Sequence, residues 1–426
     1  MLASLMAAFK LPDLRKRILF VFGMFAVFVV GLHIPVPGID RAAMEKLFSQ
    51  GSGVLGLVDI FSGGALRKFT IFAMGIAPYI NASIIMQLLT VAVPQLEALA
   101  KEGEHGRKKI SQYTRYMTVI LAAVQAFGIT RWFVGMDVLH AGVLQQIQII
   151  ITLSAGTAFL MWVGEQITDK GIGNGVSMVI FAGIVASLPF QLKTTIQVVQ
   201  ATHKWPQLIF LVALFIATIV GIVAIQQAQR KIPIQHVKRV VGNKMYGGST
   251  TFLPLRVNSA GVIPIIFAIS IQLFPATIAQ FVPGTTGIGG AFKAVANWLN
   301  PVANPWAGIP YALFIIFFTY FYTAVTFNVP EVAENLKKYG SFIPGIRPGK
   351  PTLEYLDRVM SRITLAGAVF LALIALMQYW SPALTGITSF QLAGGTSLLI
   401  LVGVALETMQ AIEAHLLMRH YEGFIK

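Results

Sequence analysis

The chain has 426 residues, of which 56% are hydrophobic and only 12% are charged. Water-soluble proteins usually have about a quarter charged residues, so this composition excludes an ordinary globular protein and indicates a chain embedded in lipid. The formal net charge is +15. Cysteine is absent, and its absence excludes disulfides and thiolate metal sites.

The N-terminal region contains Lys10 and the basic run 15–17, followed by an apolar run that reaches about residue 34. A basic segment before an apolar one is also how a signal peptide begins. This apolar run is long, however, and the segment 35–38 that follows reads PVPG, with no cleavage pattern of small residues. The sequence therefore predicts a retained first membrane span.

Further along the chain, apolar runs recur at lengths that suit membrane helices. Crossing a hydrocarbon core of roughly 30 Å takes about 20 residues in a helix. Ten runs meet this length: 18–36, 70–92, 116–135, 146–164, 176–192, 206–226, 259–282, 309–328, 362–380 and 392–413. Because ten is even, both termini are expected on the same side of the membrane.

The distribution of Lys and Arg predicts which side that is. If the N-terminus is cytoplasmic, 24 of the 32 Lys and Arg residues fall on the inner segments. Cytoplasmic segments of membrane proteins carry an excess of these residues. The basic loops and both termini are therefore predicted to be cytoplasmic.

The ten runs divide into two groups of five. The N-terminal half covers 1–192, an external hinge linker covers 193–205, and the C-terminal half covers 206–426. Two consecutive groups with an odd number of spans insert with opposite orientations, as in inverted-repeat proteins. No residue-level similarity between the halves is visible, so two unrelated five-helix units are the alternative.

A shorter apolar stretch, about 57–66, lies between the first two spans and ends near a Gly-Gly pair. At about half the length of a span, it is predicted to be re-entrant or interfacial. Irregular backbone at membrane depth must be buried in protein or line a cavity.

Two inner loops are long. Loop 229–257 has β-prone runs on both sides of a Gly-Gly pair, which predicts a cytoplasmic hairpin. Loop 329–361 is predicted to form a short helix at 331–338 and a turn at 344–350. Basic loops of this kind dock either anionic lipid or an acidic partner such as ribosomal RNA, and both alternatives remain open.

The spans lack the groups that chemistry would need. Their central parts have almost no ionisable residues, since Glu407 and Glu413 lie near the inner end of the last span. Ion-coupled transport uses such residues. The buried amides Asn81, Gln87, Gln125 and Gln272 are interpreted as helix-to-helix hydrogen-bonding groups.

No catalytic or metal-binding pattern is present either. The seven histidines are scattered without a metal-ligand spacing. The sequence GIGNG at 171–175 follows a membrane helix, so it predicts a tight inner turn and not a nucleotide loop. We predict no enzymatic activity and no cofactor. A passive pore closed by apolar side chains fits best; a secondary transporter of small solutes and a structural scaffold are the alternatives.

Seven stretches of this sequence stand out: FSGGAL at 61–66, GIAPYINASIIMQLL at 75–89, EGEHGRKKISQYTRY at 102–116, GEQITDKGIGNG at 164–175, AGVIP at 260–264, FIPGIRPG at 342–349 and GGTSLLI at 394–400. Together they resemble the SecY family, the channel subunit of the bacterial Sec translocon. They occur in order along essentially the whole chain. The resemblance implies an all-α polytopic membrane protein, with ten transmembrane helices in two inverted five-helix halves around a central pore, and a short plug helix.

The resemblance also implies roles for individual residues. A ring of isoleucines is expected to form the pore constriction: Ile76, Ile80, Ile180, Ile266 and Ile400. The plug is expected to contain Leu57, Ile60, Phe61, Ser62, Gly63 and Gly64. A lateral gate is expected between the second and third spans on one side and the seventh and eighth on the other, with Gln87 on its wall.

By the same resemblance, the chain resides in the bacterial plasma (inner) membrane and moves secretory or membrane polypeptides that bear signal sequences. The expected docking residues for the motor ATPase SecA and the ribosome are Lys238, Arg239, Arg347 and Lys350. The small subunits SecE and SecG are expected as membrane partners. One departure is that Val329 separates Asn328 from Pro330, where the family usually places Pro directly after Asn.

Overall fold

The structure is a computed structural model, and all structural statements concern the residues that it describes. These are 9–39, 44, 59, 62–136, 138–139, 141–236, 239–241, 244–246, 250–281, 290–291, 294–295, 298–299, 305–387, 390 and 395–422. The predicted plug residues Leu57, Ile60 and Phe61 and the docking residue Lys238 lie outside this part of the chain.

Each of the ten predicted apolar runs contains a helix. These helices are α2 (Pro12–Gly31), α6 (Ala77–Ala92), α8 (Glu104–Gly135), α9 (Val143–Lys170), α10 (Gly175–Thr202), α11 (Trp205–Gln227), α12 (Ile263–Phe281), α14 (Gly308–Thr326), α16 (Lys350–Thr385) and α17 (Thr396–Glu422). Within the described residues, seven helices are long and apolar enough to cross a membrane by themselves, or eight when α6 and the adjoining α7 (Pro94–Lys101) count as one bent span. The predicted multi-span helical fold is confirmed, and the count of ten is consistent with it.

Two predicted boundaries differ from the structure. Residues 71–76 form turns, so the second predicted span is helical only from Ala77. Helix α6 ends at Ala92, because Val93 precedes a proline and a residue in that position disfavours the helical conformation. The predicted hinge linker 193–205 is mostly helical: α10 continues to Thr202 and α11 begins at Trp205. Backbone hydrogen bonding in α10 therefore continues past the apolar stretch from which the boundary was predicted.

Other helices also extend beyond their apolar runs into the predicted loops. Helix α8 begins at Glu104, and an ion pair from Lys108 Nζ to Glu104 Oε1 at 2.9 Å spans one turn of its polar end. The predicted helix at 331–338 is confirmed as α15 (Val329–Lys338). Its first turn is capped by the side chain of Asn328, which accepts a hydrogen bond from the Glu331 backbone N–H.

The glycine-rich turn at 171–175 brings α9 and α10 together as predicted. A Cβ atom at Gly175 would lie 1.8 Å from the Gly164 carbonyl oxygen, so the helices approach at a distance that only glycine permits. Asn174 then caps α10 by accepting hydrogen bonds from the backbone N–H groups of Val176 and Ser177 at 3.0 and 3.2 Å.

The predicted hairpin in loop 229–257 is confirmed. Strands β1 (Gln229–His236) and β4 (Thr250–Arg256) pair antiparallel, and β2 (Arg239–Val241) pairs with β3 (Lys244–Tyr246) in a second, two-stranded sheet. The short strand β5 (Ser341–Phe342) adds to the free edge of β1. Sequence reasoning did not predict β5, which joins the two long loops.

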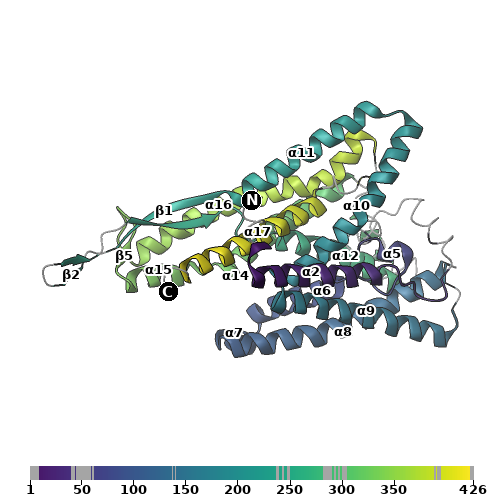
Figure 1. Cartoon of the computed structure of the whole chain (residues 1–426), viewed down its shortest axis with the longest axis horizontal. Helices are drawn as coiled ribbons and strands as arrows, with labels where there is room; N and C mark the ends of the chain where they lie inside the picture. Colours follow the sequence, from purple (N-terminus) through teal and green to yellow (C-terminus); the bar gives the residue numbers. More distant parts are fainter. Residues whose placement is uncertain are drawn as a thin grey trace.

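Figure 1 shows how the helices divide. Helices α2, α6, α8 and α9 gather on one side, whereas α11, α16 and α17 lie on the other. The halves meet along two seams, one where α12 contacts α6 and α8, and one where α10 contacts α17 and α11. The β1–β4 hairpin, α15 and α7 all lie toward one end of the long axis, and the short helix α5 (Ala65–Lys68) lies toward the opposite end.

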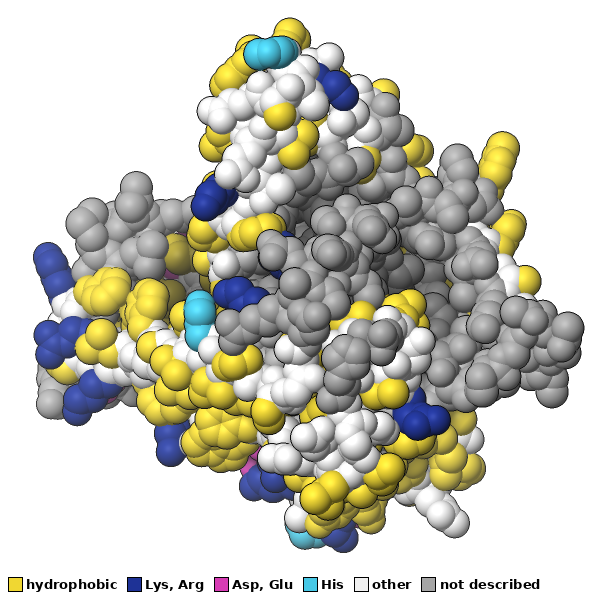
Figure 2. All heavy atoms as spheres, turned by 90° about the vertical axis from the view of Figure 1, so that its right-hand side faces the viewer, with side chains coloured by type: hydrophobic (Ala, Val, Ile, Leu, Met, Phe, Trp, Pro, Cys, Tyr) yellow, Lys and Arg dark blue, Asp and Glu magenta, His cyan; other side chains and the backbone are white. Residues whose placement is uncertain are grey.

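Figure 2 views the molecule from the end opposite the hairpin. Hydrophobic side chains cover much of the described surface in this view, and few Asp or Glu side chains are visible. In Figure 1, the hairpin, α15 and α7, which come from segments predicted to be inner, thus lie toward the end opposite α5.

Candidate functional site

The five isoleucines of the expected ring lie in one hydrophobic cluster. Ile76, Ile180 and Ile400 are at most 4% exposed, and Ile80 and Ile266 are partly buried and pack against the same cluster. They come from α6 and the turn before it, α10, α12 and α17, so both halves of the chain contribute. Sequence spacing alone could not bring these positions together, because they are spread over more than 300 residues.

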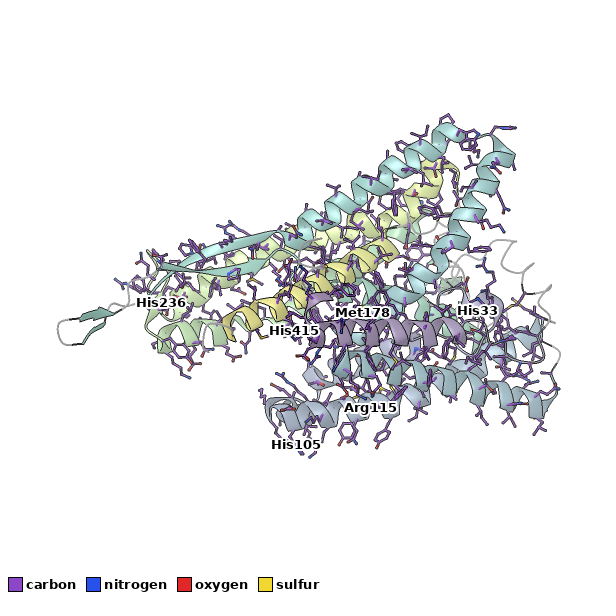
Figure 3. The ribbon with its side chains drawn as sticks, in the orientation of Figure 1. His33, His105, Arg115, Met178, His236 and His415 are labelled. Atoms are coloured by element: carbon purple, nitrogen blue, oxygen red, sulfur yellow. The ribbon has the colours of Figure 1, made fainter. Side chains whose placement is uncertain are left out.

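Partly buried hydrophobic side chains from both halves of the chain pack against this cluster. Thr408 of α17 points its Oγ1 at the Met178 sulfur of α10, with 3.9 Å between the two atoms. The central position of Met178 in the bundle is shown in Figure 3. An interior of this kind offers ions no charged or strongly coordinating ligand.

Gln87 lies on α6, one of the helices that form the seam with α12. Its Nε2 donates a hydrogen bond to Ser83 Oγ at 3.4 Å, within the same helix. In this conformation the amide donates a hydrogen bond within its own helix. Whether Gln87 acts on a gate remains a prediction.

The expected plug segment is described at Asp59 and from Ser62 onward, and it folds back on itself through polar contacts. The carbonyl oxygen of Asp59 accepts hydrogen bonds from Ser62 Oγ at 3.0 Å and from the Gly64 backbone N–H at 2.8 Å. The Ser62 hydroxyl in turn accepts a bond from the Leu66 N–H at 3.3 Å. These bonds make a compact turn that leads into α5.

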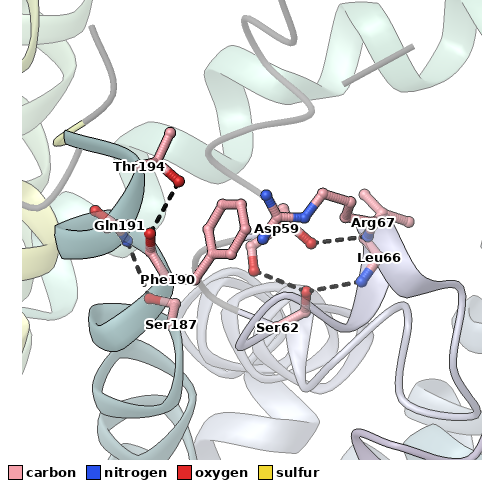
Figure 4. Close-up of polar contacts among 8 residues, drawn as sticks. All are labelled: Asp59, Ser62, Leu66, Arg67, Ser187, Phe190, Gln191 and Thr194. Atoms are coloured by element: carbon pink, nitrogen blue, oxygen red, sulfur yellow. Dashed lines mark hydrogen bonds and ion pairs between the residues drawn. The ribbon is translucent and has the colours of Figure 1, made fainter. Parts of the chain in front are cut away.

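The Asp59 carboxylate completes this turn, as Figure 4 shows. Its Oδ1 accepts a hydrogen bond from the Arg67 backbone N–H at 2.8 Å, and its Oδ2 lies 3.9 Å from Arg67 Nε. Burial raises the pKa of this carboxyl group, and the bond and positive charge of Arg67 oppose that rise. Sequence reasoning did not identify Asp59 or Arg67; a charge within a short apolar segment was the available signal.

At the opposite end, the expected docking residues Arg347 and Lys350 lie beside a buried apolar cluster. Arg347 and Lys350 are exposed, and the Arg347 carbonyl oxygen accepts a hydrogen bond from the buried Thr352 hydroxyl at 2.8 Å. Ile343 is buried beneath this turn, in a cluster that also contains Ile232 of the hairpin. Arg239 is in β2, and the structure does not describe its side chain.

A histidine links the two long loops. His236, at the end of β1, lies with Nδ1 2.8 Å from Ser341 Oγ of β5 and with Nε2 3.0 Å from Thr251 Oγ1 of β4. Together with the shared hydrophobic cluster, these bonds unite the hairpin and the loop that carries Arg347. We call this unit the cytoplasmic platform, after the side of the membrane predicted for it; it consists of β1, β4, β5, α15, the turn 343–349 and the start of α16.

No group of three or more His, Asp or Glu side chains suited to a metal ion occurs among the described residues. Figure 3 shows that His33, His105, His236 and His415 lie on separate elements. The candidate functional regions are the cluster that contains the five isoleucines, the turn from Asp59 to Arg67 and the platform.

Comparison with known proteins identifies the family. The sequence profile of SecY matches residues 70–409. A protein translocase subunit SecY of Streptomyces scabiei is 45% identical over the full length of both chains, and that of Thermotoga maritima is 45% identical over 98% of this chain and 96% of its own. The chain belongs to the SecY family.

Solved structures confirm the SecY fold at lower sequence identity. A structure described as a protein conducting channel matches 94% of this chain and 92% of its own, with a TM-score of 0.65 and 19% identity. Sec61 in a canine ribosome-channel complex matches with a TM-score of 0.62 and 18% identity, over 94% and 92% of the two chains. The chain is therefore a multi-pass membrane protein with the architecture of these channels.

Proposed function

We propose that this chain is the protein-conducting channel of a bacterial translocase. Unfolded secretory polypeptides cross the plasma membrane through its central pore, and membrane proteins leave sideways through a lateral gate. Membership in the SecY family supports channel activity. The observation that carries the pore assignment is that the five isoleucines, from both halves of the chain, share one apolar cluster.

The physical properties of such a ring suit its task. Branched apolar side chains form a compliant seal around a polypeptide of any sequence, and in its absence they close without offering water or ions a polar ligand. We assign residues 57–66 to a plug that blocks the pore on the side away from the platform. The seam at which α12 meets α6 and α8 is the proposed gate, with Gln87 on its wall.

The cytoplasmic platform is the proposed docking surface. Its exposed Arg347 and Lys350, together with Lys238 and Arg239, suit acidic partners, for which we propose SecA and the ribosome, including its RNA. Relatives have been solved in complexes with ribosomes. Anionic lipid is the competing ligand for the same charges. SecE and SecG are proposed as the accompanying membrane subunits, and both termini of the chain are assigned to the cytoplasm.

In this proposal the chain itself catalyses no reaction, and the energy for transport comes from its partner. The alternative, an inverted-repeat transporter of small solutes, finds no support among the relatives. Reconstitution with a signal-bearing substrate, SecA and ATP separates the two. Transport of the polypeptide is expected, and counterflow of a small solute without it would favour the alternative.

The pore assignment is testable because the chain has no cysteine, so one introduced thiol is unique. We expect Ile80→Cys and Ile266→Cys to form disulfides with a cysteine in a polypeptide stalled during export. Ile151→Cys and Ile209→Cys are matched controls, since these isoleucines are 63% and 72% exposed on the outside of the bundle. Equal crosslinking at ring and control positions would refute the assignment.

A further inference from the structure

Arg67 is in contact with an aromatic ring from a distant part of the chain. Its guanidinium carbon lies 3.7 Å from the centroid of the Phe190 ring. Arg67 belongs to α5, next to the proposed plug, and Phe190 belongs to α10, which forms part of the pore wall. Figure 4 shows the guanidinium between the Phe190 ring and the plug turn. A cation at this distance from a ring face is attracted by the negative potential of that face.

The plug turn holds Arg67 in this orientation. Asp59 lies 3.9 Å from its Nε and also bonds its backbone N–H, and the Asp59 side chain is only 11% exposed. The Arg67 side chain is itself 26% exposed. The contacts with the largely buried Asp59 hold the guanidinium in place, so little conformational freedom is lost when it stacks on the Phe190 ring.

Among the described residues, a second contact between the plug turn and α10 is close backbone packing. At Gly63, a Cβ atom would lie 3.1 Å from the Gly183 Cα of α10, so the two backbones touch. Such a van der Waals contact prevents the two backbones from coming closer, but no directional bond has to break when they separate. The contact of Arg67 with Phe190 adds an attraction that depends on the identity of both side chains.

We propose that Arg67 and Phe190 form a latch that fastens the plug to α10, and that the strength of the latch sets how readily the channel opens. The proposal rests on the assignment of 57–66 as the plug. A polypeptide that enters the pore must displace this segment, which separates the guanidinium from the ring. A variant that weakens the contact therefore shifts the equilibrium toward the open channel by the free energy that the contact loses.

The test uses the full chain, purified with its membrane partners and reconstituted in lipid vesicles. The readout is ion efflux without a substrate, and the second readout is export of a substrate with a shortened signal sequence. Arg67→Met keeps the length of the side chain and removes its charge, and Phe190→Leu keeps an apolar side chain and removes the ring. We expect each to raise efflux about threefold to tenfold, in proportion to a cation–π contact.

Three comparisons make this result specific. Lys68→Met removes the neighbouring, exposed cation and should leave efflux unchanged. Arg67→Lys keeps the charge without the planar stacking group, and should fall between the wild type and Arg67→Met. The double variant of Arg67→Met with Phe190→Leu should leak no more than either single variant. An additive double variant, or equal effects of Arg67→Met and Lys68→Met, would overturn the latch.

A further variant separates failure of the latch from failure of the plug. Gly63→Val places a branched side chain against the Gly183 backbone, at a φ of +73° that disfavours any residue but glycine. If Gly63→Val leaks and the latch variants do not, the latch is wrong and the plug stands. If all of these variants seal like the wild type while purifying as intact complexes, the plug assignment itself is wrong.

Discussion

In the proposed function, the apolar ring and the cytoplasmic platform act through opposite physical means. The proposed ring combines buried and partly buried isoleucines from both halves of the chain, and its function depends on the shape and polarity that they share. The platform presents exposed cations on a base of strands and buried apolar side chains, and its proposed function depends on each charge in its place. Redundant apolar packing thus serves a passage that must accept any sequence, and individually placed charges serve recognition of particular partners.

This comparison predicts different responses to substitution. Replacing one isoleucine of the ring should be partly tolerated, because the other four remain. Reversing one charge on the platform should not be tolerated. The following variants test the difference, beginning with the largest expected effect.

Arg347→Glu should have the largest effect, because it puts a negative charge where an acidic partner docks. Like charges brought together in an interface cost several kcal/mol, so we expect SecA-driven export to fall about 100-fold or more. Arg347→Lys should lose less, and Lys193→Glu, the same charge reversal at an exposed position of α10 away from the platform, should export normally. Export by purified vesicles and quantity of the chain in the membrane are both measured. Normal export by Arg347→Glu would contradict the docking assignment.

Ile80→Asn should have an intermediate effect at the ring. Its amide offers ligands to water and ions within the apolar cluster, and a polar group without a partner there costs about 1–3 kcal/mol. We expect ion efflux from vesicles to rise about tenfold while polypeptide export continues, because the other isoleucines remain. Ile80→Val keeps the branched apolar surface and should seal. Loss of export with no leak would argue that Ile80 supports the fold and does not line the pore.

Sequence patterns alone located these regions to different extents. The ten apolar runs each contain a helix because hydrocarbon thickness imposes length and apolarity together. Helix ends were less predictable: α10 runs to Thr202 because backbone hydrogen bonding continues where the apolar run has stopped. The ring was available only through the resemblance, since nothing local distinguishes Ile180 from any other isoleucine in a span.

Contacts between distant segments were beyond sequence reasoning. Strand β5 is two residues long and has no recognisable pattern, yet it joins the loops because its backbone groups pair with the edge of β1. Asp59 and Arg67 are eight residues apart and become partners only when the intervening turn has formed. These contacts depend on three-dimensional placement that neither composition nor periodicity records.

His236→Phe should have a smaller effect, on the coupling between the loops of the platform. Phenylalanine has no nitrogen atoms in its ring, so the hydrogen bonds of the imidazole with Ser341 and Thr251 are lost, each worth about 1 kcal/mol. We expect backbone amides of β5 to exchange with deuterium about fivefold to tenfold faster, and SecA affinity to fall by less than Arg347→Glu causes. Gln235→Ala, on the neighbouring exposed position of β1, is the control. Unchanged exchange in β5 would show that backbone pairing and the apolar cluster suffice to join the loops.

Gln87→Leu should have the smallest effect. It tests whether the seam is held by apolar packing, as proposed for the ring, or by an individual polar group, as proposed for the platform. Intramembrane side-chain hydrogen bonds average about 0.6 kcal/mol, so we expect only a two- to threefold change in export of substrates with weakly hydrophobic signals. In this conformation Gln87 bonds Ser83 in its own helix. Ser83→Ala removes that acceptor and leaves the amide in place, so it is the matched control. If Gln87 bridges the seam during opening, Gln87→Leu shifts the signal threshold and Ser83→Ala does not. Equal responses would show that the amide acts only through its bond within α6. Apolar packing would then hold the gate closed, as proposed for the ring.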